Sequence, residues 1–356
     1  MKIYQIVTTL GYGDAVGNNI IALMDALKRA GYQTKVFAET IDCRIEFEDI
    51  EDINTMPEVE EDDIILYHLA TGTELNFRVA EYPCKRVLIY HNITPPHFFQ
   101  KYNMQAAKNC EWGLKGTKFL ADKVDYGLAD SFFNKEELIQ MGYQCKLDVQ
   151  PILVKLDDYA KTPNSRIQQQ MNDGYENILF VGRIAPNKKQ EDVIAAFAMY
   201  KRYYNPNSRL ILAGSYRGME KYYICLKNYI ACNQIEDVIF TGHIRFDEIL
   251  AYYHSAHIFL CMSEHEGFCV PLIESMYFDV PIIAYNSTAI ADTLNSAGIL
   301  LEKKEPVETA AWMNCVSKNH SLRDVIINNQ RERLRFFSEE KIRDSFITYM
   351  KEFIGG

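Results

Sequence analysis

The residues Ser263-Glu-His-Glu-Gly-Phe-Cys-Val-Pro-Leu-Ile-Glu-Ser275 form the most informative stretch of the chain. They follow a strand-like apolar run at 258–262 and lead into apolar residues with helical spacing, where Pro271 suits the first helical turn. The free amides at the start of such a helix point out of the carboxyl edge of a parallel sheet, and they bind anions there. This stretch therefore predicts an α/β domain with an anion site beside two carboxylates, Glu266 and Glu274.

The surrounding sequence repeats this alternation of strand and helix. Helical stretches separate six strand-like runs, at 177–181, 209–213, 238–241, 258–262, 280–285 and 298–301. This pattern is typical of a doubly wound parallel sheet with helices on both faces.

The first part of the chain carries a second series of the same kind. Residues 1–40 have the pattern of a βαβ unit, and further strand-like runs lie at 63–68, 86–91 and 126–131. A polar stretch from Lys161 to Glu176 lacks apolar periodicity and marks the boundary between the domains. We therefore expect a first domain at 1–165 and a second at 172–338, with an amphipathic C-terminal helix at 339–356 that crosses back to the first.

Composition excludes several classes of protein. A chain of 356 residues with 48% hydrophobic and 24% charged residues is globular and long enough for two domains. A net charge of -10 argues against a general nucleic-acid binder. The nine cysteines form no Cys-x-x-Cys pair, which argues against zinc knuckles and a disulfide framework. Because the sequence shows neither a signal-peptide core nor about 18 consecutive apolar residues, we expect a cytoplasmic protein.

A second candidate motif is Phe180-Val-Gly-Arg-Ile-Ala-Pro-Asn-Lys-Lys189, at the end of the strand-like run at 177–181. Arg183 offers a planar fork and Lys188 a point charge, and both suit a diphosphate. Beside such a site, the carboxylates of Glu266 and Glu274 suit the hydroxyls of a sugar or ribose. Taken alone, each motif also fits an ordinary solvated loop.

Together these motifs resemble the donor site of the retaining nucleotide-sugar glycosyltransferases of family four (group 1), which have the GT-B fold. The resemblance rests on Gly182-Arg183, Lys188 and the Glu266–Glu274 spacing, with Leu212-Ala-Gly-Ser215 and Phe240-Thr-Gly-His-Ile244 in compatible order. It implies an α/β protein of two Rossmann-like domains that face each other across a cleft, with the acceptor bound by the first domain and the nucleotide sugar by the second.

The resemblance also implies roles for individual residues of the second domain. Arg183 and Lys188 would bind the donor diphosphate, Glu266 the sugar hydroxyls and Glu274 the ribose. The amides of the segment after Glu266 would complete the phosphate site, and three further residues would lie near the base. The residues with amides at the phosphate site are Gly267, Phe268 and Cys269, and those near the base are Ser215, His243 and Ile244.

In the first domain the resemblance covers a glycine-rich loop and one histidine. Gly13, Asp14 and Gly17 would approach the donor phosphates and the acceptor, although a plain βα turn explains the same residues. His91, at the end of a strand-like run, matches a histidine near the donor sugar, whereas a structural role is the alternative. The motif Tyr90-His-Asn-Ile-Thr-Pro-Pro96 is similar to that of bacterial enzymes that build surface polysaccharides.

Residues 97–123 form a locally basic segment in an acidic chain. This segment has five lysines (101, 108, 115, 118 and 123) and only two acidic residues, Glu111 and Asp122, and aromatic residues lie between them. This pattern predicts a peripheral contact with an anionic lipid-linked acceptor or with the inner face of a membrane. Two amphipathic helices with solvated lysines are the alternative.

No Asp-x-Asp pair occurs in the chain, so we expect neither a bound metal ion nor another cofactor. Cationic side chains would bind the diphosphate in place of a metal ion. The predicted enzyme transfers a hexosyl residue, mannose or rhamnose, to a glycan or lipid-linked acceptor in polysaccharide biosynthesis. Alternatives are a nucleotide-sugar epimerase or hydrolase of the same fold and a non-catalytic nucleotide-sugar-binding subunit. An NAD-dependent dehydrogenase is disfavoured because glycines 11, 13 and 17 do not follow the dinucleotide-binding spacing.

Overall fold

A computed structural model describes residues 1–355, which divide into two compact units. Unit 1 contains Met1–His97, Gln105–Lys155 and the chain from Phe337 onward. Unit 2 contains Phe98–Met104 and Leu156–Phe336. Within residues 1–355, no helix combines the length and the apolarity needed to cross a membrane.

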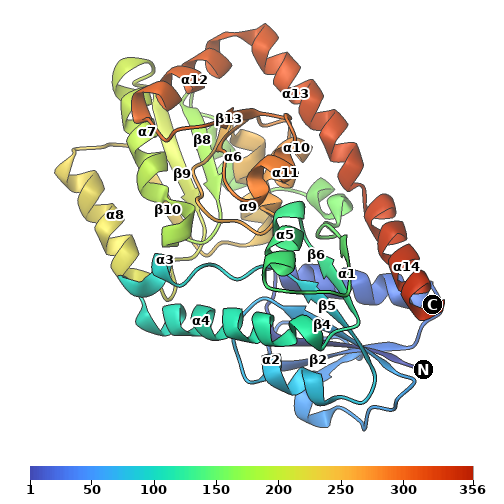
Figure 1. The fold of residues 1–356 in the computed structure, drawn as a ribbon. Coiled ribbons are helices and arrows are strands. Elements are labelled where there is room, and N and C mark those ends of the chain that lie inside the picture. The colour runs from blue at the N-terminus through green and yellow to red at the C-terminus, as the bar shows by residue number, and fades with distance from the viewer. Residues whose placement is uncertain (356) are drawn as a thin grey trace. The chain divides into compact units, whose positions relative to one another are not determined.

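Unit 1 is built on a seven-stranded parallel sheet with the strand order β3-β2-β1-β4-β5-β6-β7 (Figure 1). Its strands are β1 (Ile3–Leu10), β2 (Thr34–Ile41), β3 (Ile50–Asp52), β4 (Ile64–Leu69), β5 (Lys85–Tyr90), β6 (Tyr126–Ala129) and β7 (Lys146–Val149). Its helices are α1 (Ala15–Arg29), α2 (Leu75–Arg78), α5 (Phe132–Gln140) and α14 (Glu339–Gly355). Two more helices, α3 (His97–Gln100) and α4 (Met104–Phe119), lie where the division between the units falls.

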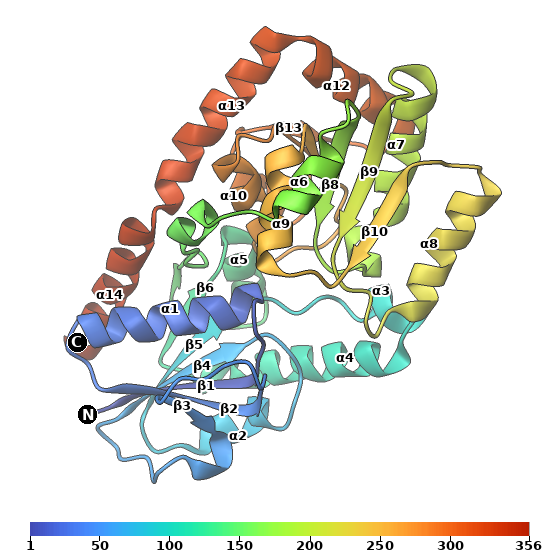
Figure 2. The ribbon, with the colours of Figure 1, turned by 180° about the vertical axis from the view of Figure 1, so that it is seen from behind.

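The last helix, α14, is part of unit 1 although it ends the chain. It lies beside α1 in both ribbon views (Figure 2). The ring of Phe353 stacks on Tyr126 with centroids 5.4 Å apart, and the Gln150 side chain donates to the carbonyl of Ile342 at 3.0 Å. The amphipathic pattern of this helix thus buries its apolar face against the first sheet.

Unit 2 contains a six-stranded parallel sheet with the strand order β10-β9-β8-β11-β12-β13. Its strands are β8 (Glu176–Val181), β9 (Ser208–Ala213), β10 (Val238–Gly242), β11 (Ile258–Cys261), β12 (Ile282–Tyr285) and β13 (Ile299–Leu301). Its helices are α6 (Ser165–Met171), α7 (Gln190–Tyr203), α8 (Glu220–Cys232), α9 (Phe246–Ser255), α10 (Val270–Tyr277), α11 (Ala289–Leu294), α12 (Pro306–Lys318) and α13 (His320–Leu334). Every residue of β9 and β11 is buried, as expected for parallel strands covered on both faces.

The predicted α/β class with two doubly wound sheets is confirmed, and the structure differs from the sequence analysis in three details. Two short strands, β3 and β7, were not predicted. Helix α6 lies inside the polar stretch at 161–176, where Ile167 and Met171 are buried one turn apart. The division between the units falls after Lys155, before the predicted boundary, and unit 2 also takes in Phe98–Met104.

Candidate active site

The centre of the sheet in unit 2 is a topological switch point. Strands β8 and β11 are neighbours, and the chain continues outward to β9 on one side and to β12 on the other. The loop 182–189 joins β8 to α7, and the loop 262–269 joins β11 to α10, so both loops leave the carboxyl ends of adjacent strands. Ligands of doubly wound folds bind at this position.

Lys188 and Glu266, one from each loop, form an ion pair. The Glu266 side chain is 8% exposed and that of Lys188 22%, so the pair is largely removed from water. Burial acts to lower the pKa of Lys188, but Glu266 and the neighbouring Cys269 and Cys261 together outweigh burial, so the net pKa is raised. The lysine therefore stays charged at neutral pH. Its ammonium group has three N–H donors, so two remain for a phosphate group.

Further hydrogen bonds hold the two loops together. The amide of Glu264 donates to the carbonyl of Asn187 at 2.8 Å, and the Asn187 side chain donates to the carbonyl of His265 at 3.1 Å. The amide of Glu266 donates to the hydroxyl of Thr288 at 2.9 Å. The backbone around Glu266 is thus fixed from three sides before any ligand binds.

Two thiols lie beside this ion pair. The ligand atoms of Cys261, Glu266 and Cys269 all lie within 4.8 Å of one another, and all three residues are buried. Within residues 1–355 this is the group of potential metal ligands that the structure brings together. The ammonium group of Lys188, paired with Glu266, places a positive charge beside it. The hydrogen bond with Cys261, together with burial, raises the pKa of the Cys269 thiol. The expectation of no metal stays a prediction.

Arg183 lies on the same loop as Lys188, and its side chain is exposed. Among the described residues 1–355 its guanidinium group makes no hydrogen bond or ion pair, while its carbonyl accepts from Gln190 at 2.9 Å. Gly267 and Phe268 lead into α10, and the carbonyl of Phe268 accepts from Thr293 at 2.6 Å. The structure thus brings Arg183, Lys188 and the segment after Glu266 to one edge of the sheet.

Glu274 occupies a different environment in the second turn of α10. Its two carboxylate oxygens accept hydrogen bonds from the hydroxyls of Tyr159 at 2.8 Å and Tyr253 at 2.6 Å. Burial raises the pKa of Glu274, and the two tyrosine hydroxyls partly offset this. Each oxygen keeps a free lone pair, so this carboxylate can accept one further hydroxyl on either side.

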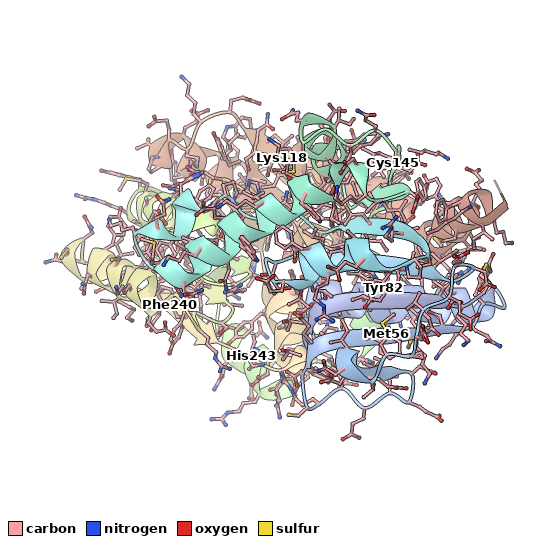
Figure 3. All side chains as sticks on the ribbon, turned by 60° about the horizontal axis from the view of Figure 1, so that its bottom comes forward. Met56, Tyr82, Lys118, Cys145, Phe240 and His243 are labelled. Carbon is pink, nitrogen blue, oxygen red and sulfur yellow. The ribbon has the colours of Figure 1, made fainter. Side chains whose placement is uncertain are left out.

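The three residues predicted near the base lie after β9 and β10. The Ser215 hydroxyl accepts from the amide of Arg217 at 3.1 Å, which closes a turn. His243 is exposed and Ile244 is half-buried. Figure 3 labels His243 and, on β10, Phe240, whose ring packs edge-on against Tyr223 at 5.1 Å.

In unit 1, His91 is part of a buried chain of hydrogen bonds. Its Nδ1 lies 2.9 Å from the carboxylate of Asp130, and its Nε2 lies 2.9 Å from His68 Nδ1. His68 Nε2 in turn lies 2.9 Å from the side-chain oxygen of Gln5. Only His91 was predicted from the sequence, because its partners lie on or after other strands at distant positions in the chain. Polar residues within apolar runs, such as Gln5 in β1 and His68 in β4, were the available signal.

The glycine-rich loop of unit 1 forms a tight turn before α1. Asp14 caps α1 and accepts from the amide of Gly17 at 2.6 Å, and Gly13 has a φ of 74° that favours glycine. A Cβ atom at Gly17 would lie 2.4 Å from the carbonyl oxygen of Gly11, so only glycine fits there. These contacts account for the turn itself and leave a role for Asp14 toward an acceptor as a prediction.

One family model matches most of unit 2. Residues 161–333 match the model of the family described as glycosyl transferases group 1. This segment belongs to the group 1 glycosyltransferases. The match contains both loops at the switch point, with Arg183, Lys188, Glu266 and Glu274, and the predicted resemblance is thereby confirmed.

Two of the curated relatives are bacterial glycosyltransferases. An α-1,4-N-acetyl-D-galactosaminyltransferase of Campylobacter jejuni, named for a diNAcBac-PP-undecaprenol substrate, is 25% identical over 178 residues, which are 49% of this chain and 48% of that enzyme. The O-antigen chain mannosyltransferase B of Escherichia coli is 25% identical over 293 residues, or 78% of this chain and 72% of that enzyme. The match to the Campylobacter enzyme thus spans about half of its length.

Among solved structures, the sucrose-phosphate synthase of Thermosynechococcus elongatus has a TM-score of 0.80 at 17% identity, with 100% of both chains covered. This likeness shows the fold alone, and it confirms the GT-B architecture predicted from the sequence.

Proposed function

We propose that the protein is a retaining glycosyltransferase that moves a hexosyl residue, mannose or rhamnose, from a nucleoside-diphosphate sugar to a glycan or lipid-linked acceptor in polysaccharide biosynthesis. The Lys188–Glu266 pair at the switch point of a group 1 domain carries this proposal. The O-antigen mannosyltransferase among the relatives favours mannose. Neither a metal nor another cofactor takes part.

In this mechanism the cations act on the leaving group. Arg183 and the two remaining N–H donors of Lys188 bind the diphosphate and stabilise the negative charge that grows as the glycosidic bond breaks. Glu266 orients the sugar hydroxyls, and Glu274 accepts from the ribose. The acceptor hydroxyl attacks on the face that the diphosphate leaves, and its proton passes to the leaving phosphate, so the anomeric configuration is retained.

Transfer assays with single variants test the assignment. Arg183→Ala and Glu266→Ala should each lower transfer from GDP-mannose or dTDP-rhamnose by a factor of about 100 or more, because preorganised charge is lost. Arg202→Ala, on the exposed surface of α7, is the matched control and should leave transfer unchanged. Near-normal transfer by either active-site variant in a folded protein would contradict the proposal.

Incubation with the donor alone separates the other candidate functions. Rapid loss of the sugar nucleotide without an acceptor would indicate an epimerase or a hydrolase, whereas binding without turnover under any acceptor would indicate a binding subunit. Thermal shift with UDP, GDP, dTDP and ADP identifies the base, because a ligand at 100 times its Kd stabilises the folded state by about 2.7 kcal/mol.

Contact with a membrane or an anionic lipid-linked acceptor through residues 97–123 is part of the proposal. On α4, Trp112 and Phe119 pack on Phe77 at 4.8 and 5.1 Å and are 39% and 38% exposed. Lys108 and Lys118 are exposed on the same helix, and Figure 3 labels Lys118. An aromatic cluster flanked by lysines suits an anionic lipid surface.

Cosedimentation with phosphatidylglycerol vesicles tests this contact, with phosphatidylcholine vesicles as reference. Each lysine near an anionic membrane contributes about 1 kcal/mol, so Lys108→Gln/Lys118→Gln should weaken binding roughly 30-fold. The exposed pair Lys303→Gln/Lys318→Gln on unit 2 is the charge-matched control. Equal losses in both double variants would show that only net charge matters.

A further inference from the structure

The buried hydrogen-bond chain of unit 1 crosses four neighbouring strands. Gln5 lies in β1, His68 in β4, His91 directly after β5 and Asp130 directly after β6, and these strands are consecutive in the sheet. Each of the three links is 2.9 Å long. The side chains of His91 and Asp130 are 0% and 1% exposed, so water cannot replace any partner.

The geometry restricts where the protons can lie. Burial, with a smaller contribution from His91, lowers the pKa of His68 well below its usual range, so His68 is neutral and has one N–H donor. With the Gln5 oxygen facing His68 Nε2, that nitrogen donates and His68 Nδ1 accepts. His91 Nε2 must then carry a proton, and a second proton lies between His91 Nδ1 and Asp130 Oδ2.

The reverse direction of donors is the alternative. It requires the Gln5 amide to be turned over, which would give Gln5 Nε2, buried without a partner within residues 1–355, an acceptor at His68 Nε2. His68 would then donate to His91 Nε2, and a neutral His91 would face an ionised Asp130. That arrangement leaves one negative charge buried without a compensating positive charge, which is costly in a protein interior. The first arrangement has no net charge. Asp130 Oδ1 has no partner within residues 1–355, and burial raises the pKa of this carboxyl, which also favours retention of the proton.

We propose that Gln5, His68 and Asp130 are positioning residues that commit both ring nitrogens of His91 to partners inside unit 1 and retain a proton on the line between His91 and Asp130. The titratable groups that face His91 are His68 from β4, Asp130 from the end of β6 and Asp14 from the N-cap of α1. A histidine held in this way has no ring nitrogen with which to take a proton from an acceptor or to bind a sugar hydroxyl.

The kinetic consequence rests on the proposed function. If the protein transfers sugars, His91 contributes through its position, and it does not take the proton of the acceptor. The protonation state itself is a property of unit 1 and can be measured whether or not the protein transfers a sugar.

Nitrogen-15 NMR of the imidazole groups in the full chain tests the proposal, with His91 assigned by the signals lost in His91→Phe. We expect a proton on His91 Nε2 and a shared or bound proton at Nδ1 at pH 7. In Asp130→Asn the chain still directs a proton to Nε2, so His91 should keep that proton and lose the one at Nδ1. Asp125→Asn, which changes an exposed carboxylate just before β6, should match the wild type.

Two results would overturn the proposal. One is a wild-type His91 whose Nε2 is unprotonated at pH 7, and the other is an Asp130→Asn variant that keeps the proton at Nδ1 and leaves Nε2 bare. Because the first measurement uses the unaltered protein, a variant that fails to fold does not remove the test.

Discussion

The ion pair between Lys188 and Glu266 makes a quantitative prediction for Glu266→Gln. This change keeps the shape of the side chain and leaves the lysine ammonium without its counter-ion among buried thiols. Removing one partner of a fully buried pair costs about 3–5 kcal/mol. Since the Lys188 side chain retains 22% exposure and some hydration, we expect a loss of about 2–4 kcal/mol in the free energy of unfolding of unit 2.

Guanidinium unfolding at pH 7, followed by a probe in unit 2, measures this loss. Lys188→Met should destabilise unit 2 as well, and the double variant Lys188→Met/Glu266→Gln should lose less than the two single variants together, with a coupling energy of about 1–3 kcal/mol. Because the folded pKa of Lys188 is raised, its contribution is fully present below the ordinary lysine value of 10.5 and is lost only as the pH rises through the folded pKa.

An exposed pair in the same unit provides the control. Lys161 and Asp158 lie 2.6 Å apart with side chains 64% and 45% exposed, and such pairs contribute about 0–1 kcal/mol. Asp158→Asn should therefore change the stability of unit 2 little. If Glu266→Gln proves as mild as Asp158→Asn, or if the two active-site changes are additive, the account of a coupled buried pair is wrong.

Three further predictions concern other parts of the structure. Because the pKa of Glu274 is raised in the folded state, its ionisation lowers the stability of the wild type as the pH rises above the ordinary value of 4.5. Glu274→Gln should thus be about as stable as the wild type at pH 4 and should become relatively more stable toward pH 7. Thermal unfolding across this pH range measures the difference, and a difference that stays constant would contradict the prediction. Gly17→Ala places a Cβ atom 2.4 Å from a carbonyl oxygen and should destabilise unit 1 by about 1–3 kcal/mol in urea unfolding. Gly355→Ala, with open space at its Cβ position and no positive φ, should cost less, and the opposite order would refute the packing argument. A thiol reagent such as DTNB should react first with the exposed Cys43, Cys225, Cys232 and Cys315, and a Cys269→Ala variant should leave this fast phase unchanged. A fast phase that loses one thiol in Cys269→Ala would show that the cluster at the ion pair is open to solvent.

The strands that make both sheets were largely predictable because parallel strands buried on two faces are apolar throughout. All six runs expected in the second domain correspond to strands β8 to β13. The strands β3 and β7 were missed because they are short and partly exposed, so they lack this signal. Helix α6 was missed because only Ile167 and Met171 mark its buried face within a polar sequence.

The candidate site was predictable where motifs are local. Arg183 and Lys188 lie on one loop, and Glu266 and Cys269 on another, so chain order and strand adjacency suffice to bring them together. The tyrosines that bind Glu274 and the side chains that bind His91 belong to other elements. No periodicity within one segment identifies such partners, because tertiary packing alone makes them neighbours.

The packing of α14 on the first sheet has a consequence for folding during synthesis. Residues up to Lys155 leave the ribosome well before Ile342 and Phe353, which Gln150 and Tyr126 contact in unit 1. Unit 2 has all of its residues once Phe336 has emerged. During synthesis, unit 1 therefore begins to fold before unit 2 and is completed after it, and its apolar surface stays uncovered until α14 has emerged.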